Sequence, residues 1–415
     1  MNAFTIAFAY MRLRPLHMTL NVILLALGIA AISLLMLFAH QLENRMMRNA
    51  AGIDMVVGAK GSPIQLILSS LYHLDVPTGN IPLAEAESLA ADPRVKSVMP
   101  LALGDSFRGF RIVGTSHSYV AHYGGDILAG TLWDVTMEVT LGAVAARDLG
   151  LVVGDQFIPN HGLANAASNH SDHRYRIVGV LKPTGTVVDR LILTSVESVW
   201  VVHGYNPMNA MQIENRADEH NTVEDHEGSE EKETTYEITA LLVKFRSPIA
   251  LVSLPRFINA RTSMQAALPG YEISRLMKLV GFGVDGFRAF AGVLVVSAGL
   301  GIFTTLYNAL SERRYDIAVF RALGASQGRV LWQFLLEGAL LSLVGAVLGL
   351  VVAHSIAELT GIWLWREHQL DFSGMIWLAG EFWLLGLAVT IGLVAGLLPA
   401  IQAYRLDVSG VLAKG

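Results

Sequence analysis

Long apolar runs and one long stretch of mixed polarity alternate along this chain. A helix needs about 20 residues to cross the apolar core of a bilayer. Four runs meet that length, at residues 18–39, 289–310, 330–353 and 375–400. Residues 41–280, between the first two runs, have the mixed pattern of a water-exposed fold. The pattern predicts a membrane protein with four transmembrane α-helices and a large α+β extracytoplasmic domain between helices 1 and 2.

The stretch 41–280 contains two clusters of helices and strands on either side of a strand-rich middle. The first cluster has a strand-like segment and two helix-like segments, at 53–59, 62–74 and 82–93. The second is expected to run strand, helix, strand, at 236–245, 249–267 and 271–276. We therefore expect a membrane-proximal α/β part at about 41–115 and 236–280, interrupted by an inserted β-rich part at about 116–235.

Composition supports the membrane prediction and excludes several function classes. Hydrophobic residues make up 53% of the 415 residues, which is high for a soluble protein of this length. The net charge of −5 argues against nucleic-acid binding, which needs concentrated basic surface. With no cysteine, the chain has no disulfides and no thiolate site.

The sequence also lacks the motifs of common enzymes. The phosphate-binding pattern GxxxxGK[ST] is absent, and its nearest match, "GAKGS" at 58–62, lacks the Lys-Ser/Thr ending. Neither GxSxG nor HExxH occurs. We therefore expect no enzyme activity in this chain and no ATP hydrolysis by it alone.

Basic residues predict the orientation, because Lys and Arg flanking short loops stay in the cytoplasm. They precede the first run, link the second to the third, and follow the fourth; they are Arg12, Arg14, Arg313, Arg314, Arg321, Arg329, Arg405 and Lys414. Both termini are predicted to be cytoplasmic. The expected parts are 1–40 with helix 1, the periplasmic domain 41–280, and 281–415 with helices 2–4. The first run is long for a signal peptide and no clear cleavage site follows it, so we expect it to remain as an anchor.

Histidines gather in two polar tracts of the extracytoplasmic stretch. The members of these tracts are His161, His170, His173, His220 and His226, the last two among several Asp and Glu residues. Imidazole and carboxylate groups suit Zn²⁺, so the tracts are candidate metal ligands. The alternative is a solvated acidic loop with incidental histidines.

The segment 311–329 between the second and third runs carries a patterned set of charges. Ile317, Phe320 and Leu323 recur at helical spacing, and Gly324 is suited to close such a helix. One interpretation is an amphipathic helix on the inner membrane surface that acts as a lever. The other is a charged turn that only satisfies the positive-inside bias.

The third and fourth runs carry small and acidic residues. Gly338, Ser342, Gly345 and Gly349 share one face of the third run, and "GLVAG" at 392–396 lies in the fourth, so close helix contacts are expected. Glu337 and Glu381 are costly in a membrane unless paired or hydrated. Interfacial placement or a structural hydrogen bond is favoured over a proton relay.

Residues 311–349 resemble the signature of FtsX/MacB-like ABC transporter permeases, the lipoprotein-releasing type included. The family pattern E-R-x-x-E-I-G-x-x-R-A-x-G-A stands here with Asp316 and Ala318 in place of Glu and Gly. "FLLEG" at 334–338 and the closing "GLLPAIQAYRLDVSGVL" are also similar to the family, although Leu406-Asp407 stands where a proline is usual. The segments "LGAVAARDLGLVVGDQF" and "YRIVGVLKPTG" look like the family's extracytoplasmic domain.

This resemblance implies a multi-pass subunit of the bacterial inner membrane that works by mechanotransmission. It implies a dimer, with a homodimer expected, that binds two copies of a cytoplasmic ABC ATPase holding ATP and Mg²⁺. It also implies a porter-like α/β part and an inserted β-rich part in the periplasmic domain. The residues implied to couple to the ATPase are Arg313, Arg314, Asp316, Ile317, Phe320, Arg321 and Gly324.

The expected function is export or extraction of a periplasmic or membrane cargo, and the histidines favour a version linked to zinc handling. The alternative is a non-transporting regulator that activates a periplasmic partner when the ATPase hydrolyses ATP. A metal-binding outer receptor with a passive anchor is a third, weaker interpretation.

Overall fold

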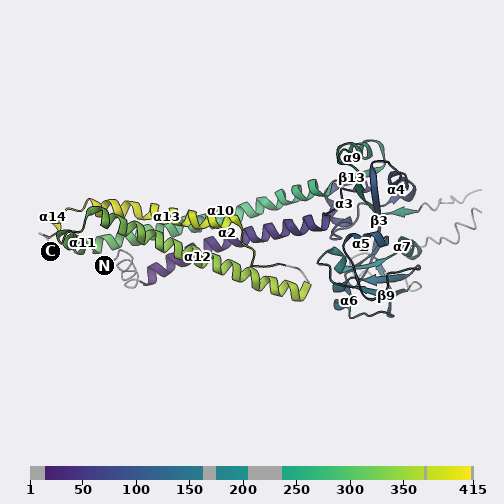
Figure 1. Cartoon of the computed structure of the whole chain (residues 1–415), viewed down its shortest axis with the longest axis horizontal. Helices are drawn as coiled ribbons and strands as arrows, with labels where there is room; N and C mark the ends of the chain where they lie inside the picture. The colour runs from purple at the N-terminus through teal and green to yellow at the C-terminus, as the bar shows by residue number, and fades with distance from the viewer. Residues whose placement is uncertain (1–14, 162–173, 204–235, 369–371, 413–415) are drawn as a thin grey trace, which may run out of the picture. The chain divides into compact units, whose positions relative to one another are not determined.

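The computed structural model describes residues 15–161, 174–203, 236–368 and 372–412. The chain divides into two units (Figure 1). The span unit comprises Met1–Leu42 and Lys278–Gly415, and the inserted unit comprises Glu43–Met277.

The span unit is built from long helices. They are α2 (Pro15–Ala50), α10 (Pro269–Glu312), α12 (Gln327–His368) and α13 (Ala379–Tyr404), of which α2 and α10 continue into the inserted unit. Among the described residues these four are long and apolar enough to cross a membrane. The prediction of four apolar helices around an inserted α/β domain is confirmed.

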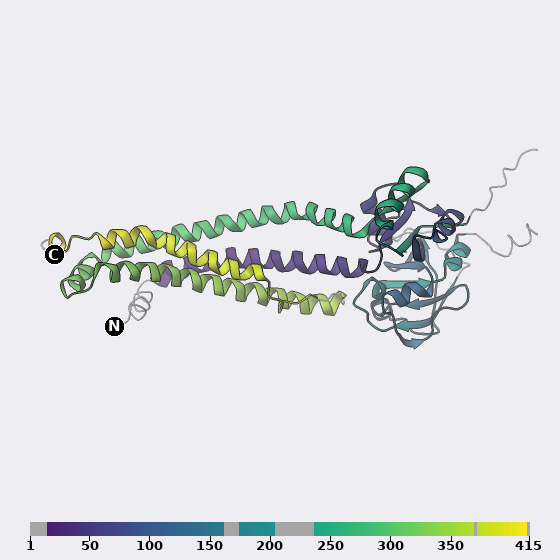
Figure 2. The same ribbon diagram turned by 45° about the horizontal axis from the view of Figure 1, so that its top comes forward.

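The four helices share one apolar interior, and Figure 2 shows α10, α12 and α13 running alongside one another. Each helix contributes two buried side chains to one cluster, which contains Leu25, Ile29, Val295, Ala298, Ala346, Leu350, Leu384 and Ala388. A second cluster lies nearer the C-terminal end of α13 and includes Met18, Leu306, Phe334 and Ala403. The span unit therefore forms a bundle with a continuous buried seam.

Small residues set the closest helix contacts of the bundle. Gly338 of α12 lies against Gly392 of α13, so that a Cβ at Gly392 would stand 2.2 Å from Ser342 Oγ and 2.3 Å from the Gly338 carbonyl oxygen. Further along α12, Gly345 and Gly349 face Leu25 and Ala26 of α2. The single stripe seen in the sequence therefore contacts two different helices, with Gly338 and Ser342 at α13 and Gly345 and Gly349 at α2.

The inserted unit is a mixed sheet with helices packed on it. The sheet has eleven strands, with β13, β1, β12, β3, β4, β10, β6, β9 and β5 in order, β7 added to β9 and β8 added to β3; β2 and β11 form a separate pair. The strands are β1 (Met55–Ala59), β2 (Ile81–Pro82), β3 (Val95–Phe107), β4 (Phe110–Gly114), β5 (Ile127–Gly130), β6 (Glu138–Leu141), β7 (Gln156–Phe157), β8 (Asn160–His161), β9 (Tyr175–Leu181), β10 (Leu191–Thr194), β11 (Glu237–Ile238), β12 (Ala240–Phe245) and β13 (Met264–Ala267).

The helices of the inserted unit are short. They are α3 (Pro63–Ser70), α4 (Leu83–Ala90), α5 (His117–His122), α6 (Ala143–Leu149), α7 (Val196–Val202) and α9 (Ala250–Arg261), with a 3₁₀ turn at Val187–Arg190. Ser62 caps the N-terminus of α3, because its side chain accepts a hydrogen bond from the Gln65 backbone N–H. Pro63 occupies the first turn of the helix.

Strand β3 joins two cores because it is thirteen residues long. Its first half pairs with β12 and its second half with β4. One core lies beside the first half and includes Met55, Val57, Leu241 and Leu254, and the other lies beside β4, β6 and β9 and includes Ile112, Val139, Leu141 and Ile177. In Figure 1, α9, α3 and α4 lie at one end of β3, and α6 and β9 lie at the other.

The prediction for residues 249–276 was partly wrong. The helix expected at 249–267 ends at Arg261, and Met264–Ala267 form the edge strand β13, paired antiparallel with β1. The strand expected at 271–276 is the beginning of helix α10, which starts at Pro269. Residues 264–267 pair with the edge of β1 and supply backbone hydrogen-bond partners that a continued helix could not give that strand, so tertiary contact overrides the local pattern.

A buried polar cluster holds the start of the inserted unit. The hydroxyls of Tyr72 and Tyr123 donate to the Met46 and Asn49 carbonyl oxygens at 2.9 and 3.0 Å. His73 Nε2 lies 3.0 Å from the Tyr119 hydroxyl. Burial, together with the nearby positive charge of the Arg111 guanidinium, lowers the pKa of His73 to about 3.

Gly392→Val is expected to destabilise the span unit, because the new side chain cannot fit against Gly338 and Ser342. Overpacking of this kind costs about 1–3 kcal/mol. The melting temperature of the protein in detergent measures this loss of stability. Gly386→Val in the same helix is the matched control, since nothing lies within 4 Å of a Cβ there. Equal melting temperatures for the two variants would contradict the packing account.

Acid is expected to destabilise the inserted unit through His73. As pH falls below 6.5, unfolded His73 binds a proton while the folded residue stays neutral until about pH 3. The unfolded state then binds more protons, so stability falls by up to about 1.4 kcal/mol per pH unit over this window and is unaffected above it.

His73→Asn removes this titration and suits the backbone, because φ is +56° at His73 and Asn tolerates that region. Hydrogen exchange of inserted-unit peptides between pH 4 and 7 compares the two proteins. His117→Asn, at an exposed histidine, is the control. An identical pH dependence for wild type and His73→Asn would rule out His73 as the source.

Candidate functional site

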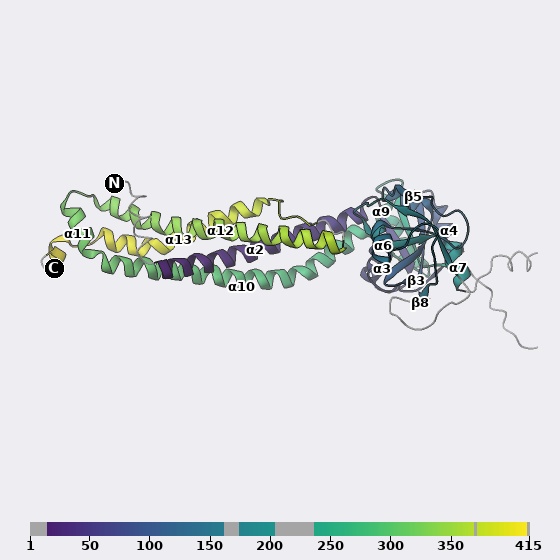
Figure 3. The same cartoon turned by 90° about the horizontal axis from the view of Figure 1, so that it is seen from below.

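The segment between α10 and α12 folds into the short helix α11 (Arg314–Ala322) (Figure 3). Its apolar face is buried through Ile317 and Ala318, and Ile317 joins the cluster with Phe334 and Ala403. Gly324 follows the helix with φ +101°, and the Ala325 N–H donates to the Phe320 carbonyl oxygen at 3.0 Å. This geometry is that of a glycine-terminated helix end.

Arg313 ties the start of α11 to the third apolar helix. Its Nη1 atom lies 3.4 Å from Oε2 of Glu337, whose side chain is 0% exposed, while that of Arg313 is 14% exposed. Oε1 of Glu337 has no hydrogen-bond partner among the described residues. A carboxylate buried among apolar side chains needs a cation nearby, so this ion pair holds Arg313 in place.

Arg321 ties the other end of α11 to the end of α13. Its Nη1 atom donates to the Leu406 carbonyl oxygen at 2.5 Å. Leu406 lies two residues beyond the last residue of α13, where backbone carbonyls lack helical partners. Arg313 and Arg321 thus fix both ends of α11 to the bundle.

The remaining polar and aromatic residues of α11 face outward. Arg314, Asp316 and Phe320 are exposed, and so are Tyr315 and Leu323, at 52% and 79%. Of the seven predicted coupling residues, three therefore lie on the free surface, three are directed into the bundle, and Gly324 ends the helix. Tyr315 and Leu323 were missed as site residues, although Leu323 belonged to the apolar spacing that predicted the helix.

An open groove of about 660 Å³ lies beside α11. It is formed by the end of α10, by α11, and by α14 (Val408–Leu412), which contacts α11. Its lining carries both charge signs, with Arg314 and Arg405 near Glu312 and Asp407. Hydrogen bonds from Ser409 lower the pKa of Asp407, so this carboxylate stays ionised.

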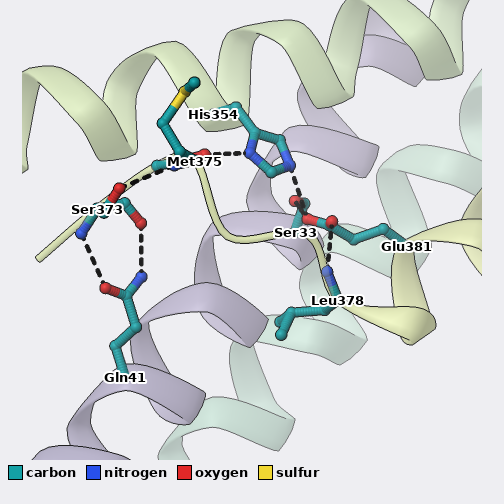
Figure 4. Close-up of polar contacts among 8 residues, drawn as sticks. Ser33, Gln41, His354, Ser373, Met375, Leu378 and Glu381 are labelled. Carbon is teal, nitrogen blue, oxygen red and sulfur yellow. Dashed lines mark hydrogen bonds and ion pairs between the residues drawn. The ribbon is translucent and has the colours of Figure 1, made fainter.

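A second polar site lies at the other end of α13 (Figure 4). Glu381 Oε1 accepts from Ser33 Oγ at 2.6 Å, and Glu381 Oε2 accepts from the Leu378 N–H at 3.0 Å. His354 Nε2 lies 3.0 Å from Glu381 Oε1. The expectation that Glu381 makes a structural hydrogen bond is confirmed, but His354 and Ser33 were not singled out in the sequence.

The predicted metal ligands fall mostly outside the described residues. The backbone of His161 belongs to β8 and pairs with Asp105 of β3, but its side chain is outside the description, as are His170, His173, His220 and His226. Within 15–161, 174–203, 236–368 and 372–412, no group of three or more His, Asp or Glu residues could hold a metal ion. The zinc prediction stays a prediction.

Two family descriptions match most of the chain. The description "MacB-like periplasmic core domain" matches residues 18–248, and "FtsX-like permease C-terminal" matches residues 288–408. The chain belongs to the MacB/FtsX-like ABC transporter permease family. The resemblance seen in the sequence is confirmed. For this permease, the second matched region contains α11 and both of its anchors, Glu337 and Leu406.

Named relatives cover the permease unevenly. The pyoverdine export ATP-binding/permease protein PvdT of Pseudomonas fluorescens is 23% identical over 98% of this chain and 58% of the relative. The macrolide export ATP-binding/permease protein MacB of Rhodopirellula baltica is 31% identical over 33% of this chain and 20% of the relative. The permease thus spans less than two thirds of the length of these proteins.

A solved structure also resembles part of the permease. The periplasmic region of MacB from Actinobacillus actinomycetemcomitans is 14% identical, covers 56% of this chain and 97% of that structure, and has a TM-score of 0.33.

Arg313→Ala is expected to lower the stability of the permease by about 3–5 kcal/mol, because it leaves the Glu337 carboxylate buried without its cation. Thermal unfolding in detergent provides the measurement. Arg314→Ala, at the next residue and exposed, should change it little. The double variant Arg313→Met/Glu337→Leu should recover most of the loss; a double variant as unstable as Arg313→Ala would contradict an electrostatic origin.

Proposed function

We propose that this chain is the permease subunit of an ABC exporter that is driven by an ATPase outside these 415 residues. One observation carries the proposal: α11 presents a free surface of Arg314, Asp316 and Phe320 while both of its ends are fixed to the bundle through Arg313 and Arg321. A helix held in this way transmits a push on its outer face to α12 and α13 instead of absorbing it.

The surface of α11 has the composition of a protein docking site. Aromatic side chains and arginine dominate the binding energy of protein interfaces, and Tyr315, Phe320 and Arg314 supply both kinds. The neighbouring groove offers further charged groups from α14. We assign this surface, within the coupling segment 311–329, to the nucleotide-binding partner.

The names of the relatives support the assignment of export. PvdT and MacB are named as ATP-binding and permease functions in one protein. The present sequence contains no GxxxxGK[ST] loop, so the proposal assigns ATP and Mg²⁺ to the partner. Two such partners would serve a dimer of permeases in a bacterial inner membrane, with both termini in the cytoplasm and residues 41–280 in the periplasm.

Movement of the periplasmic domain is the proposed output. Helices α2 and α10 each continue from the span unit into the inserted unit without a break in the helix. Displacement of the bundle at α11 would therefore reach the periplasmic domain through two helical connections. The cargo lies in the periplasm or the outer leaflet under this proposal.

A cysteine introduced at the surface of α11 tests the docking partner, since the natural chain has no cysteine. Phe320→Cys, modified with a thiol-reactive photo-crosslinker in inside-out membrane vesicles, should capture a protein that contains a GxxxxGK[ST] loop. Mass spectrometry of the adduct identifies that loop. Labelling should be strong in inside-out vesicles and absent in intact spheroplasts.

Ile317→Cys is the matched control, because Ile317 lies one turn away on the buried face of α11. It should label slowly and capture little. Labelling of Phe320→Cys from the periplasmic side would overturn the orientation. Capture of lipid or of proteins without a nucleotide-binding loop would overturn the docking proposal.

A further inference from the structure

Around Glu381, the hydrogen-bond acceptors outnumber the hydrogens that the neighbouring donor groups supply. The Gly374 carbonyl oxygen can only accept, so Nδ1 of His354, which contacts it, carries a hydrogen. The other ring nitrogen, Nε2, faces Glu381 Oε1 at 3.0 Å. A neutral imidazole with hydrogen on Nδ1 has a lone pair on Nε2, and an ionised carboxylate offers another lone pair.

One additional proton resolves this conflict. Either His354 is doubly protonated beside an ionised Glu381, or Glu381 is protonated and donates to a neutral His354. Ser33 Oγ and the Leu378 N–H already donate to the two oxygens of Glu381, so they do not supply a donor for the His354 side. The Glu381 side chain is 1% exposed, so a solvent water is poorly placed to supply the missing hydrogen.

Other groups around the pair do not provide the missing hydrogen. Glu358, one turn along α12, is occupied by the Ser373 hydroxyl and the Gly374 N–H at 3.3 and 2.8 Å. On α2, Ser33 and Gln41 are neutral, and His40 on the same helix is exposed. On α10, Asp285 and Arg288 pair with each other at 3.0 Å. Arg366 on α12 is exposed.

Trp377 favours a cation at His354. Its ring stacks on the imidazole with a centroid distance of 4.2 Å and an interplanar angle of 25°. An aromatic face attracts a positive charge, so this contact is stronger when the imidazole is protonated.

The same few residues join three helices. Gln41 of α2 exchanges two hydrogen bonds with the Ser373 backbone, both at 2.9 Å. Glu381 of α13 reaches Ser33 of α2 and His354 of α12 (Figure 4). The segment 372–378 lies between them, and a Cβ at Gly374 would stand 2.3 Å from the His354 carbonyl oxygen. We call this arrangement the clasp.

We infer that the clasp is a proton-dependent latch, in which one proton shared by His354 and Glu381 holds α2 against the hairpin of α12 and α13. Loss of that proton places two lone pairs face to face at a buried contact. His354 and Glu381 then separate, the segment 372–378 loosens, and α2 is released at the end of the bundle where the chain leaves for the inserted unit. The pH of the compartment at that end thereby controls the mobility of α2.

Hydrogen exchange of residues 372–380 tests the latch in the full chain in lipid nanodiscs. The N–H groups of Ser373, Gly374, Met375 and Leu378 all donate within the clasp, so they report its closure. After correction for intrinsic exchange rates, wild-type protection should fall at least tenfold between pH 6 and pH 9.5.

Glu381→Gln should abolish this pH step while keeping protection high. Its amide can donate to His354 Nε2 and to Ser33 Oγ and can accept from the Leu378 N–H without an added proton. His354→Gln should also abolish the step, because no shared proton remains. Glu358→Gln is the matched control: it contacts the same segment without facing His354 Nε2 and should keep the step.

A wild-type protein with constant protection over this range would overturn the latch, as would a step that persists in Glu381→Gln. The measurement involves no ATPase, so its outcome is independent of the docking test on α11.

Discussion

A carboxylate placed among apolar helices has to find its partner within the protein, and two such groups organise the span unit. Solvation by water is lost in that environment, and the energetic cost is recovered only through a nearby cation or hydrogen-bond donors. Glu337 takes Arg313 as its partner, and Glu381 takes Ser33 and His354. Each contact joins particular segments at a defined position, because ion pairs and hydrogen bonds are more directional than dispersion contacts.

The two carboxylates lie towards opposite ends of the bundle and bind different kinds of neighbour. Glu337 fixes α11, a helix whose outer face is free. Glu381 fixes the start of α13 together with α12 and α2. The permease thus has a rigid attachment at its proposed ATPase face and, in the proposed latch, an attachment whose strength depends on pH at the other end.

In the inserted unit, a single strand connects the two hydrophobic cores. One thirteen-residue strand, β3, serves two hydrophobic cores, so neither core can shift without moving the strand that the other also uses. Backbone hydrogen bonds along β3 provide the connection, with no need for an interface between independent domains. The buried His73 and the tyrosines around it anchor the beginning of this unit to Met46 and Asn49.

The sequence by itself determined the four apolar helices, the mixed inserted region and the family relationship, because hydrophobic length, periodicity and motif spacing are local properties. It also indicated α11 through the spacing of Ile317 and Phe320 and the placement of Gly324. Only the tertiary structure decided that Arg313 and Arg321 turn inward while Arg314 stays free, that 264–267 forms an edge strand, and that Glu381 meets Ser33, 348 positions away. Helix packing determines which residues this far apart along the chain come into contact. The local sequence around a charged or polar side chain does not specify that partner.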